Sequence, residues 1–516
     1  MTQTARISPT KENPNGATSS QVPLRWLFAA LSFLSILPYW TLRYPVIGDY
    51  PNHLARWFLL HHLQDPRVQF DHFFAADWGP FPYVATDALG VWMQYVLPID
   101  LVGRIILSLC VISIPAACYY FLRIVNPGHE YLALWAFLIA FNPNFIMGSL
   151  ASELSVALCL VVVTLWVRFC DAPTVARAFF LTLIMSLLFL THLTGFGVAG
   201  IVMGVYCLAT RKPFMRLVSL ALISVPGLAM FLLSRGHGGS QATLHYQGMT
   251  AWEKLRNLAF TLRFFTTPEA AGAILCLVAI AFIFWKSNAV FWNRPWLFVG
   301  AALLGAYLIA PEEYGLGGYL DVRIIPCLYL FLLAALQINR HRKWMIVAAT
   351  VFVLLGILRI ETLFISKQKE LRNLSVALDV IPRDAKVLPV LDLASVKTLV
   401  GRGEFHHLEY GVIEKGLLVP SVFHIPGVQP LRLVGDGYCP NPFCIVMEPK
   451  TTDWRKIRQD YDYLWVEPFP EAITYITAIA DPIFANEFVA VYRIRRDAAT
   501  AIDASPVSLA NGLNSN

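Results

Sequence analysis

The dominant pattern along the chain is a series of long apolar runs separated by short polar loops. An apolar run of about 20 residues is the length of a helix that crosses a bilayer. The pattern therefore predicts about eleven transmembrane helices, at residues 24–42, 101–122, 131–146, 153–169, 177–192, 195–210, 214–233, 270–286, 295–310, 324–338 and 343–364. The first run lacks a small-residue cleavage site and is expected to stay as an anchor.

The composition agrees with this pattern. Of 516 residues, 57% are hydrophobic and only 14% are charged, which excludes an ordinary soluble globular protein. The formal net charge of +6 comes from Lys and Arg scattered between the apolar runs. Because they form no basic face, nucleic acid is not an expected partner, whereas membrane lipids are.

The segment 84–97, VATDALGVWMQYVL, decides the predicted topology. If it does not cross the membrane, basic residues such as Arg123, Arg168 and Arg340 fall in cytoplasmic loops, as the positive-inside rule prefers. We therefore expect a multi-pass protein of the plasma membrane, the inner membrane of a bacterium, with a cytoplasmic N-terminus and the C-terminus outside. The transmembrane domain would span 21–365, with its first outer loop at 43–100.

The pattern changes after residue 365. Apolar runs of strand length at 386–391, 463–467 and 488–494 alternate with helical stretches such as 367–380 and 454–460. This pattern predicts a small soluble α/β domain over 366–496 on the outer face. It contains no nucleotide-binding or hydrolase motif, so we assign it no chemistry of its own. The ends, 1–20 and 497–516, are polar and aperiodic and are expected to be disordered.

Most cysteines lie in or beside apolar runs, but Cys439 and Cys444 lie in the outer domain, in CPNPFC. In an oxidising compartment they form a candidate disulfide. The adjacent pairs His61-His62 and His406-His407 have side chains that point apart on a helix or strand. We therefore predict no metal site.

The first outer loop contains the largest group of candidate functional residues, in the segment RYPVIGDYPNHLARWFLLHHL at 43–63. Pro51 predicts the start of a helix, which places His53 about one turn beyond Asp49 on the same face, with Arg56 following. Asp49 has two compatible interpretations. It caps the helix, or it is a general base at the membrane surface.

Four further residues have the same double interpretation. Glu153 begins an apolar span and either complements the helix dipole or takes part in chemistry. His192, in THLTG, either packs or contacts a substrate. Arg323 enters an apolar span, where a charge needs a partner. That partner is either Asp321, in a structural ion pair, or a lipid phosphate.

The fourth is Arg256, in the long loop 234–269. Basic and aromatic residues just outside a membrane can hold a phosphate and stack on a sugar. The alternative is an ordinary interfacial helix with snorkelling side chains. The predicted topology places this loop on the same side as the other candidates.

This layout of an anchor, a long acidic outer loop, many spans and an outer C-terminal domain resembles the GT-C superfamily of membrane glycosyltransferases. Its members include protein O-mannosyltransferases and lipid A aminoarabinose transferases, which use polyprenyl-phosphate sugars. The residues that carry the resemblance are GDYPNHLAR, VGRIILSL, NPNFIMGSLASE and YLDVRIIP. The first loop lacks the paired Asp-Glu of the eukaryotic mannosyltransferases, and no WWDYG-type motif is present, so protein N-glycosylation is not expected.

The resemblance implies that Asp49 is the first-loop base or acceptor-orienting residue, that Glu153 is the acid of the second outer loop, and that Arg323 contacts the donor phosphate. His53, Arg56, His192 and Arg256 are further candidates for substrate contacts. The implied reaction transfers a sugar from a polyprenyl-phosphate donor to an acceptor on the outer face, with inversion. No cofactor is required, and a divalent metal is compatible with the chemistry but not indicated.

Two other functions stay open at this point. One is a transporter or flippase of a lipid-linked or anionic substrate, although such proteins tend to carry ionisable residues in mid-span and internal repeats. The other is a non-catalytic GT-C relative. The acceptor, whether protein, lipid or polysaccharide, does not follow from the residues.

Overall fold

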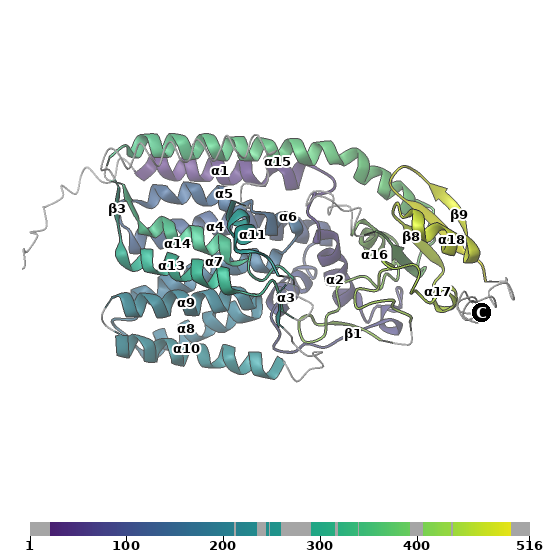
Figure 1. Ribbon diagram of the computed structural model, residues 1–516, viewed down its shortest axis with the longest axis horizontal. Coiled ribbons are helices and arrows are strands. Elements are labelled where there is room, and N and C mark those ends of the chain that lie inside the picture. Colours follow the sequence, from purple (N-terminus) through teal and green to yellow (C-terminus); the bar gives the residue numbers. More distant parts are fainter. Residues whose placement is uncertain are drawn as a thin grey trace, which may run out of the picture.

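The computed structural model describes residues 21–210, 213–234, 244–246, 248–259, 290–314, 318–338, 340–392, 406–434 and 437–496. The two predicted tails and the predicted span 270–286 lie outside the described residues. The described chain forms a helical bundle with a smaller region of strands and short helices at one end (Figure 1).

The apolar runs form the helices of the bundle. They are α1 (Gln21–Thr41), α4 (Ile99–Val125), α5 (Ala136–Ala140), α7 (Leu150–Phe169), α8 (Val175–Thr191), α9 (Leu193–Ala209), α10 (Pro213–Ser234), α13 (Arg294–Ile309), α14 (Ile324–Ala335) and α15 (Arg342–Asp379). Five described segments are long and apolar enough to cross a membrane, at Ile99–Val125, Glu130–Met147, Leu150–Phe169, Phe214–Ser234 and Arg342–Asp379. Each predicted span within the described residues contains helical structure, but the span predicted at 324–338 ends in the strand β5 (Leu336–Ile338). The total of eleven stays a prediction.

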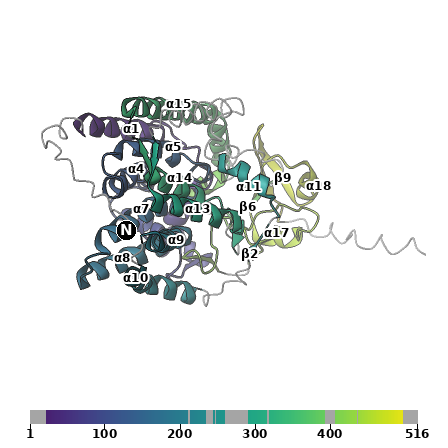
Figure 2. The ribbon, with the colours of Figure 1, turned by 60° about the vertical axis from the view of Figure 1, so that its left-hand side comes forward.

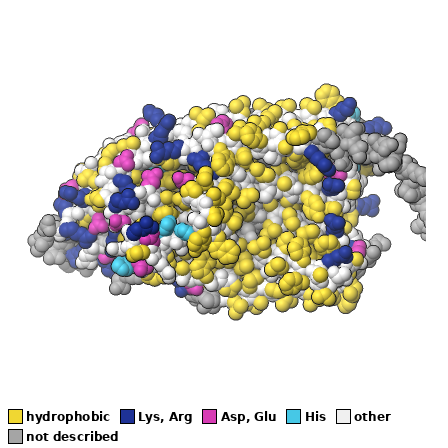
Figure 3. Space-filling model, turned by 180° about the vertical axis from the view of Figure 1, so that it is seen from behind, with side chains coloured by type: hydrophobic (Ala, Val, Ile, Leu, Met, Phe, Trp, Pro, Cys, Tyr) yellow, Lys and Arg dark blue, Asp and Glu magenta, His cyan; other side chains and the backbone are white. Residues whose placement is uncertain are grey.

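Exposed apolar side chains surround the bundle. Figure 3 shows a broad hydrophobic belt, with charged residues gathered at the outer-region end and mostly Lys and Arg at the opposite end. Side chains such as Phe179, Leu222 and Leu358 are large, apolar and exposed. A belt of this extent is typical of a surface that faces lipid.

The predicted span 131–146 is not one continuous helix. It consists of η2 (Glu130–Trp135), α5 and the short α6 (Pro143–Met147). The Asn142 side chain caps α6 by accepting hydrogen bonds from the N–H groups of Asn144 and Phe145. Pro143 has no N–H to continue the preceding helix, and Gly148 ends α6 with φ +94°, a conformation that favours glycine.

The first outer loop contains α2 (Tyr50–His62), η1 (Phe70–His72), β1 (Phe74–Ala76) and α3 (Val84–Met93). With 10 residues, α3 is about 15 Å long, half the hydrocarbon thickness. Its Asp87 is fully buried against α2. The segment 84–97 is therefore too short to cross as a helix, which agrees with the preferred topology.

Helix α15 extends far beyond the predicted span 343–364. Its 38 residues correspond to about 57 Å, against about 30 Å for the hydrocarbon layer. The predicted helix 367–380 is simply its continuation. Figures 1 and 2 show α15 running beside α1 and on toward the strands. In the outer half, the Gln368 side chain accepts a hydrogen bond from Tyr44 N–H (3.3 Å) and donates one to Tyr44 C=O (2.7 Å).

The outer region is built on a four-stranded sheet in the order β6-β8-β10-β9, in which β6 is parallel to β8 and the other pairs are antiparallel. Its elements are β6 (Val387–Val390), α17 (Trp454–Asp460), β8 (Tyr463–Val466), α18 (Pro470–Ile479), β9 (Ala480–Ala485) and β10 (Ala490–Ile494). β6, β8, β10 and α17 lie close to the predicted positions. The expected division into an outer α/β domain is considered below.

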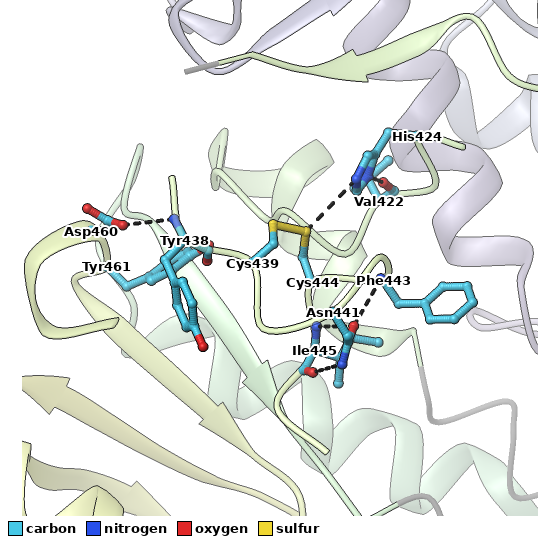
Figure 4. Close-up of a disulfide and its surroundings, with 10 residues drawn as sticks. All are labelled: Val422, His424, Tyr438, Cys439, Asn441, Phe443, Cys444, Ile445, Asp460 and Tyr461. Carbon is cyan, nitrogen blue, oxygen red and sulfur yellow. Dashed lines mark hydrogen bonds between the residues drawn. A yellow bond between two sulfur atoms is a disulfide. The ribbon is translucent and has the colours of Figure 1, made fainter. Parts of the chain in front are cut away.

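The remaining elements join these parts. They are β2 (Leu244–His245), α11 (Ala251–Leu258), β3 (Val290–Trp292), β4 (Glu313–Tyr314), β5 (Leu336–Ile338), η6 (His407–Glu409), α16 (Tyr410–Lys415) and β7 (Leu431–Leu433). β7 pairs with β1 of the first outer loop, and β2 and β3 pair with β4 and β5. Cys439 and Cys444 are joined by a disulfide, beside His424 (Figure 4).

One hydrophobic core connects the first outer loop with the C-terminal residues. Leu54 of α2, Leu374 of α15 and Leu408 of η6 are buried in the same cluster. The Arg432–Asp77 ion pair lies beside the β1–β7 ladder. The expected boundary at 365/366 therefore runs through a shared core.

Candidate functional site

The short helix α6 holds the loop that carries Asp49. The Gly48 N–H donates to Ile146 C=O (2.8 Å), and the Asp49 N–H donates to Met147 C=O (2.9 Å). The backbones approach so closely at Gly148 that a Cβ there would lie 2.5 Å from the Asp49 nitrogen. Residues 142–148, NPNFIMG, therefore hold the loop that carries Asp49 in place.

This close approach makes Gly148 a sensitive position. Gly148→Ala adds a Cβ where φ is +94° and where the Asp49 backbone blocks it. We expect any reaction that uses the Asp49 carboxylate to slow by roughly 10- to 100-fold, because a displacement of about 1 Å at a reacting group has that effect. Initial rates would be compared with those of Gly197→Ala, whose Cβ meets nothing within 4 Å. Equal rates for the two variants would contradict this account.

Asp49 occupies the N-cap position of α2, yet its side chain makes no capping hydrogen bond. The structure therefore gives no support to the capping interpretation. The carboxylate side chain is 37% exposed, and its Oδ1 lies 3.7 Å from His406 Nε2. Asp49 is therefore accessible to a substrate, whereas Glu153 and Glu409 are buried.

His53 and Arg56 lie beneath Asp49 and are buried. Arg56 donates to His53 Nδ1 (2.9 Å), so the imidazole proton is on Nε2, which donates to Gly148 C=O (2.9 Å). Burial lowers the pKa of His53 well below its usual value, and the Arg56 charge adds to this. Arg56 also donates through Nε (3.0 Å) and Nη2 (2.7 Å) to Asp87. Both residues therefore lie where they support the loop rather than face a substrate.

Glu153 is at the beginning of α7 and only 1% exposed. Its Oε2 accepts a hydrogen bond from Asn142 Nδ2 (2.8 Å), the residue that also caps α6. Its Oε1 finds no hydrogen-bond partner among the described residues. A buried carboxyl oxygen without a donor is costly, which makes Glu153 a candidate for a functional role.

Arg323 lies at the start of α14, and its guanidinium is half-buried. Arg323 Nη1 donates to the Tyr83 hydroxyl (2.9 Å) and lies 2.9 Å from His192 Nε2. Since His192 Nδ1 accepts from Thr194 N–H (3.1 Å), its Nε2 carries the proton and also donates to Tyr83 (2.9 Å). Arg323 and His192 thus both donate to the Tyr83 hydroxyl oxygen. The structure therefore brings these two predicted residues together.

The expected structural partner of Arg323 is engaged elsewhere. Asp321 Oδ2 lies 3.5 Å from Lys254 Nζ, which is also 3.3 Å from Glu312. Within the described residues, Arg323 makes no ion pair with a carboxylate. The Asp321 pairing considered from the sequence is therefore wrong. The charge of Arg323 instead acts on the Glu153 carboxyl, without an ion pair between them in the described residues.

Arg256 is exposed on α11 and makes no contact with the other candidate residues in the described part of the chain. The same helix instead contributes the buried Lys254. Groups of metal-ligating side chains are absent from the described ranges.

Sequence reasoning missed Tyr83, and it dismissed His406 together with the whole C-terminal region. Tyr83 has φ +80°, a strained conformation for a residue other than glycine. Strain of this kind often marks a functional position, but no local sequence signal reveals it. His406 comes within reach of Asp49 only through the shared core.

Known protein structures share the fold of this chain, although curated sequences do not match it. No family model matches the sequence, and no curated protein sequence matches it significantly. Two crystal structures of ArnT from Cupriavidus metallidurans, one bound to undecaprenyl phosphate and one in the apo state, match nearly the whole chain. Each has a TM-score of 0.54 and 12% sequence identity, with coverage of 92% and 93% of this chain and of 98% and 99% of theirs.

The chain has the ArnT fold. The resemblance predicted from the sequence is therefore confirmed at the level of fold. The ArnT fold and the apolar helices together describe a multi-pass membrane protein.

Proposed function

We propose that this protein is an integral-membrane glycosyltransferase that moves a sugar from a polyprenyl-phosphate donor to an acceptor at the outer face of a bacterial inner membrane. The observation that carries the proposal is Arg323, a half-buried cation that contacts Tyr83 and His192 and makes no ion pair with a carboxylate within the described residues, while the neighbouring Asp321 pairs with Lys254. A lipid phosphate supplies the missing charge. That an ArnT structure is bound to undecaprenyl phosphate supports the same ligand class here.

In the proposed mechanism, Asp49 accepts the proton of the acceptor hydroxyl as its oxygen attacks the anomeric carbon. The bond between that carbon and the phosphate oxygen breaks on the opposite side, which inverts the configuration. Arg323 stabilises the charge of the departing lipid phosphate through charge-assisted hydrogen bonds. Glu153 supplies a second carboxyl group, at the start of α7, which accepts a hydrogen bond from Asn142, the residue that caps α6.

The site also favours an enzyme over a transporter. Asp49 lies before a helix, Glu153 in a first turn and Arg323 at an N-cap, so the candidate residues sit at helix ends instead of mid-span. The Lys and Arg at the far end of the hydrophobic belt support an outward orientation of the site.

The test is sugar transfer by the purified full-length protein in detergent, with radiolabelled undecaprenyl-phosphate pentoses and hexoses and acceptors extracted from cells. We expect label to pass from the lipid to an acceptor with at least one donor. Absence of transfer with every donor, from protein that remains folded, would overturn the proposal.

Arg323→Gln tests the phosphate contact. Charged hydrogen bonds are worth about 1.5–3 kcal/mol, so we expect undecaprenyl phosphate to bind roughly 10- to 150-fold more weakly. The matched control is Arg168→Gln. Arg168 also donates to a tyrosine hydroxyl, that of Tyr120 (3.4 Å), but it lies in the last turn of α7, whereas Glu153 lies in the first turn. If both variants bound the lipid as wild type does, Arg323 would not be the phosphate ligand.

A further inference from the structure

The C-terminal region places two side chains, His406 and Glu409, in a line behind Asp49. His406 Nδ1 lies 3.0 Å from Glu409 Oε1, and His406 Nε2 lies 3.7 Å from Asp49 Oδ1. His406 and Glu409 are buried, while Asp49 is accessible. An imidazole thus bridges a hidden carboxylate and the candidate base.

Several contacts fix the orientation of this imidazole. Ser421 Oγ donates to Glu409 Oε1 (2.8 Å), and Asn52 Nδ2 donates to Ser421 C=O (2.9 Å). The Asn52 Oδ1 accepts from Phe423 N–H (2.8 Å), and the Phe423 ring packs edge-on against His406 (5.1 Å). Asn52 Nδ2 also lies 3.1 Å from His406 Nδ1, but its two protons have acceptors in Ser421 C=O and Glu409 Oε1 (3.4 Å). Because the Glu409 carboxylate only accepts hydrogen bonds, the Nδ1 that faces it carries a proton.

The surrounding charges favour the imidazolium form. Burial alone would lower the pKa of His406, but the negative charges of Glu409 and Asp49 raise it above its usual value. Glu409 and Asp49 act on His406 among the described residues, and His406 in turn acts on His53, which Arg56 contacts. His53 is neutral, since burial and Arg56 lower its pKa.

His407 provides an internal comparison. It is as deeply buried as His406, but its Nε2 lies 2.8 Å from the Ser375 hydroxyl, and its ring packs on Tyr44 and Tyr410. Burial lowers the pKa of His407 to about 3. The pKa values of the two adjacent histidines are therefore shifted in opposite directions, because two carboxylates lie beside His406.

We propose that His406 is a positioning residue for Asp49, holding the carboxylate ionised and aimed at the acceptor hydroxyl. This rests on the proposed glycosyltransferase function. During transfer the acceptor O–H proton passes to Asp49, the new C–O bond forms, and the phosphate leaves with the electron pair of the broken bond. His406 keeps its proton throughout, and Asp49 later releases the transferred proton to water.

The kinetic test compares His406→Asn, Glu409→Gln and His407→Asn in the full-length protein. We expect His406→Asn to lower kcat roughly 10- to 100-fold with little change in KM for the lipid donor. The acid limb of the pH–rate profile should move to higher pH, because losing the imidazolium makes Asp49 easier to protonate. Glu409→Gln should move the alkaline limb to lower pH, because His406 then loses its proton more readily.

The control is His407→Asn, which removes a histidine of equal burial without touching Asp49. A fall of the same size in both histidine variants, uniform across pH, would show a merely structural role and overturn the proposal. If His406→Asn does not fold, the pH–rate profile of Glu409→Gln alone tests the proposal. An alkaline limb at the wild-type position would overturn the proposal.

A second measurement does not depend on transfer. In nitrogen-15 histidine-labelled protein, the His406 resonance should report an imidazolium near neutral pH and titrate at lower pH in Asp49→Asn. If it does so while no donor supports transfer, the proposed function fails and the pairing stands. If transfer occurs but the resonance ignores Asp49→Asn, the positioning role fails and the transferase stands.

Discussion

Replacing Asp49 by Asn is expected to lower sugar transfer at least ~100-fold, the scale of a lost general base. Asn has the same shape, and the Asp49 side chain makes no capping hydrogen bond, so α2 should not be weakened. The loop stays attached to α6 through its backbone. Initial rates with a radiolabelled polyprenyl-phosphate sugar would measure the loss, and binding of undecaprenyl phosphate should change little.

The matched control is Asp100→Asn. Asp100 is likewise an exposed acid at the beginning of a helix, in the first turn of α4. Its variant should transfer sugar at the wild-type rate. Transfer that survives in Asp49→Asn would leave the transferase in place but would remove Asp49 as its base.

Asp87→Ala should cause a large loss of stability, about 3–5 kcal/mol, the usual effect of removing one partner of a buried ion pair. Asp87 accepts hydrogen bonds from Arg56 and from Trp57 Nε1 (2.9 Å), and both charged groups are buried. The variant leaves the Arg56 charge without its partner, at a place where Arg56 also orients His53. Thermal unfolding in detergent would measure the loss.

The double variant Arg56→Met, Asp87→Leu separates structure from chemistry. It removes both charges, so we expect most of the stability to return. Stability restored together with transfer would confirm that Arg56 is a support. A stable double variant that no longer transfers sugar would instead return Arg56 to the substrate contacts predicted from the sequence.

The helices were predictable because apolar runs identify them without knowledge of their neighbours. The sequence also indicated which acids lie together, since Asp49 and Glu153 fall on the same side once the loops are assigned. The break at Asn142-Pro143 was readable as a helix start, but the apolar residues around it predicted one span. The extension of α15 was missed because its outer half becomes polar.

The contacts between distant segments were not predictable. Arg323 and Asp321 are two residues apart, yet Asp321 pairs with Lys254, from a helix nearly 70 positions earlier in the sequence. His406 and Asp49 are separated by more than 350 residues and meet through the core that α15 and β7 complete. The expectation that the neighbouring histidines diverge was sound, but only the fold shows which of them faces a carboxylate.

Because α15 passes from the hydrophobic belt into the outer core without a break, it acts as a spacer of fixed length. Its Gln368 holds the backbone of Tyr44, so the first outer loop that carries Asp49 is fixed to this helix. The phosphate of a lipid donor, in contrast, lies at the height that the bilayer sets. The distance between base and donor therefore depends on hydrocarbon thickness, and membrane composition becomes a variable of the reaction.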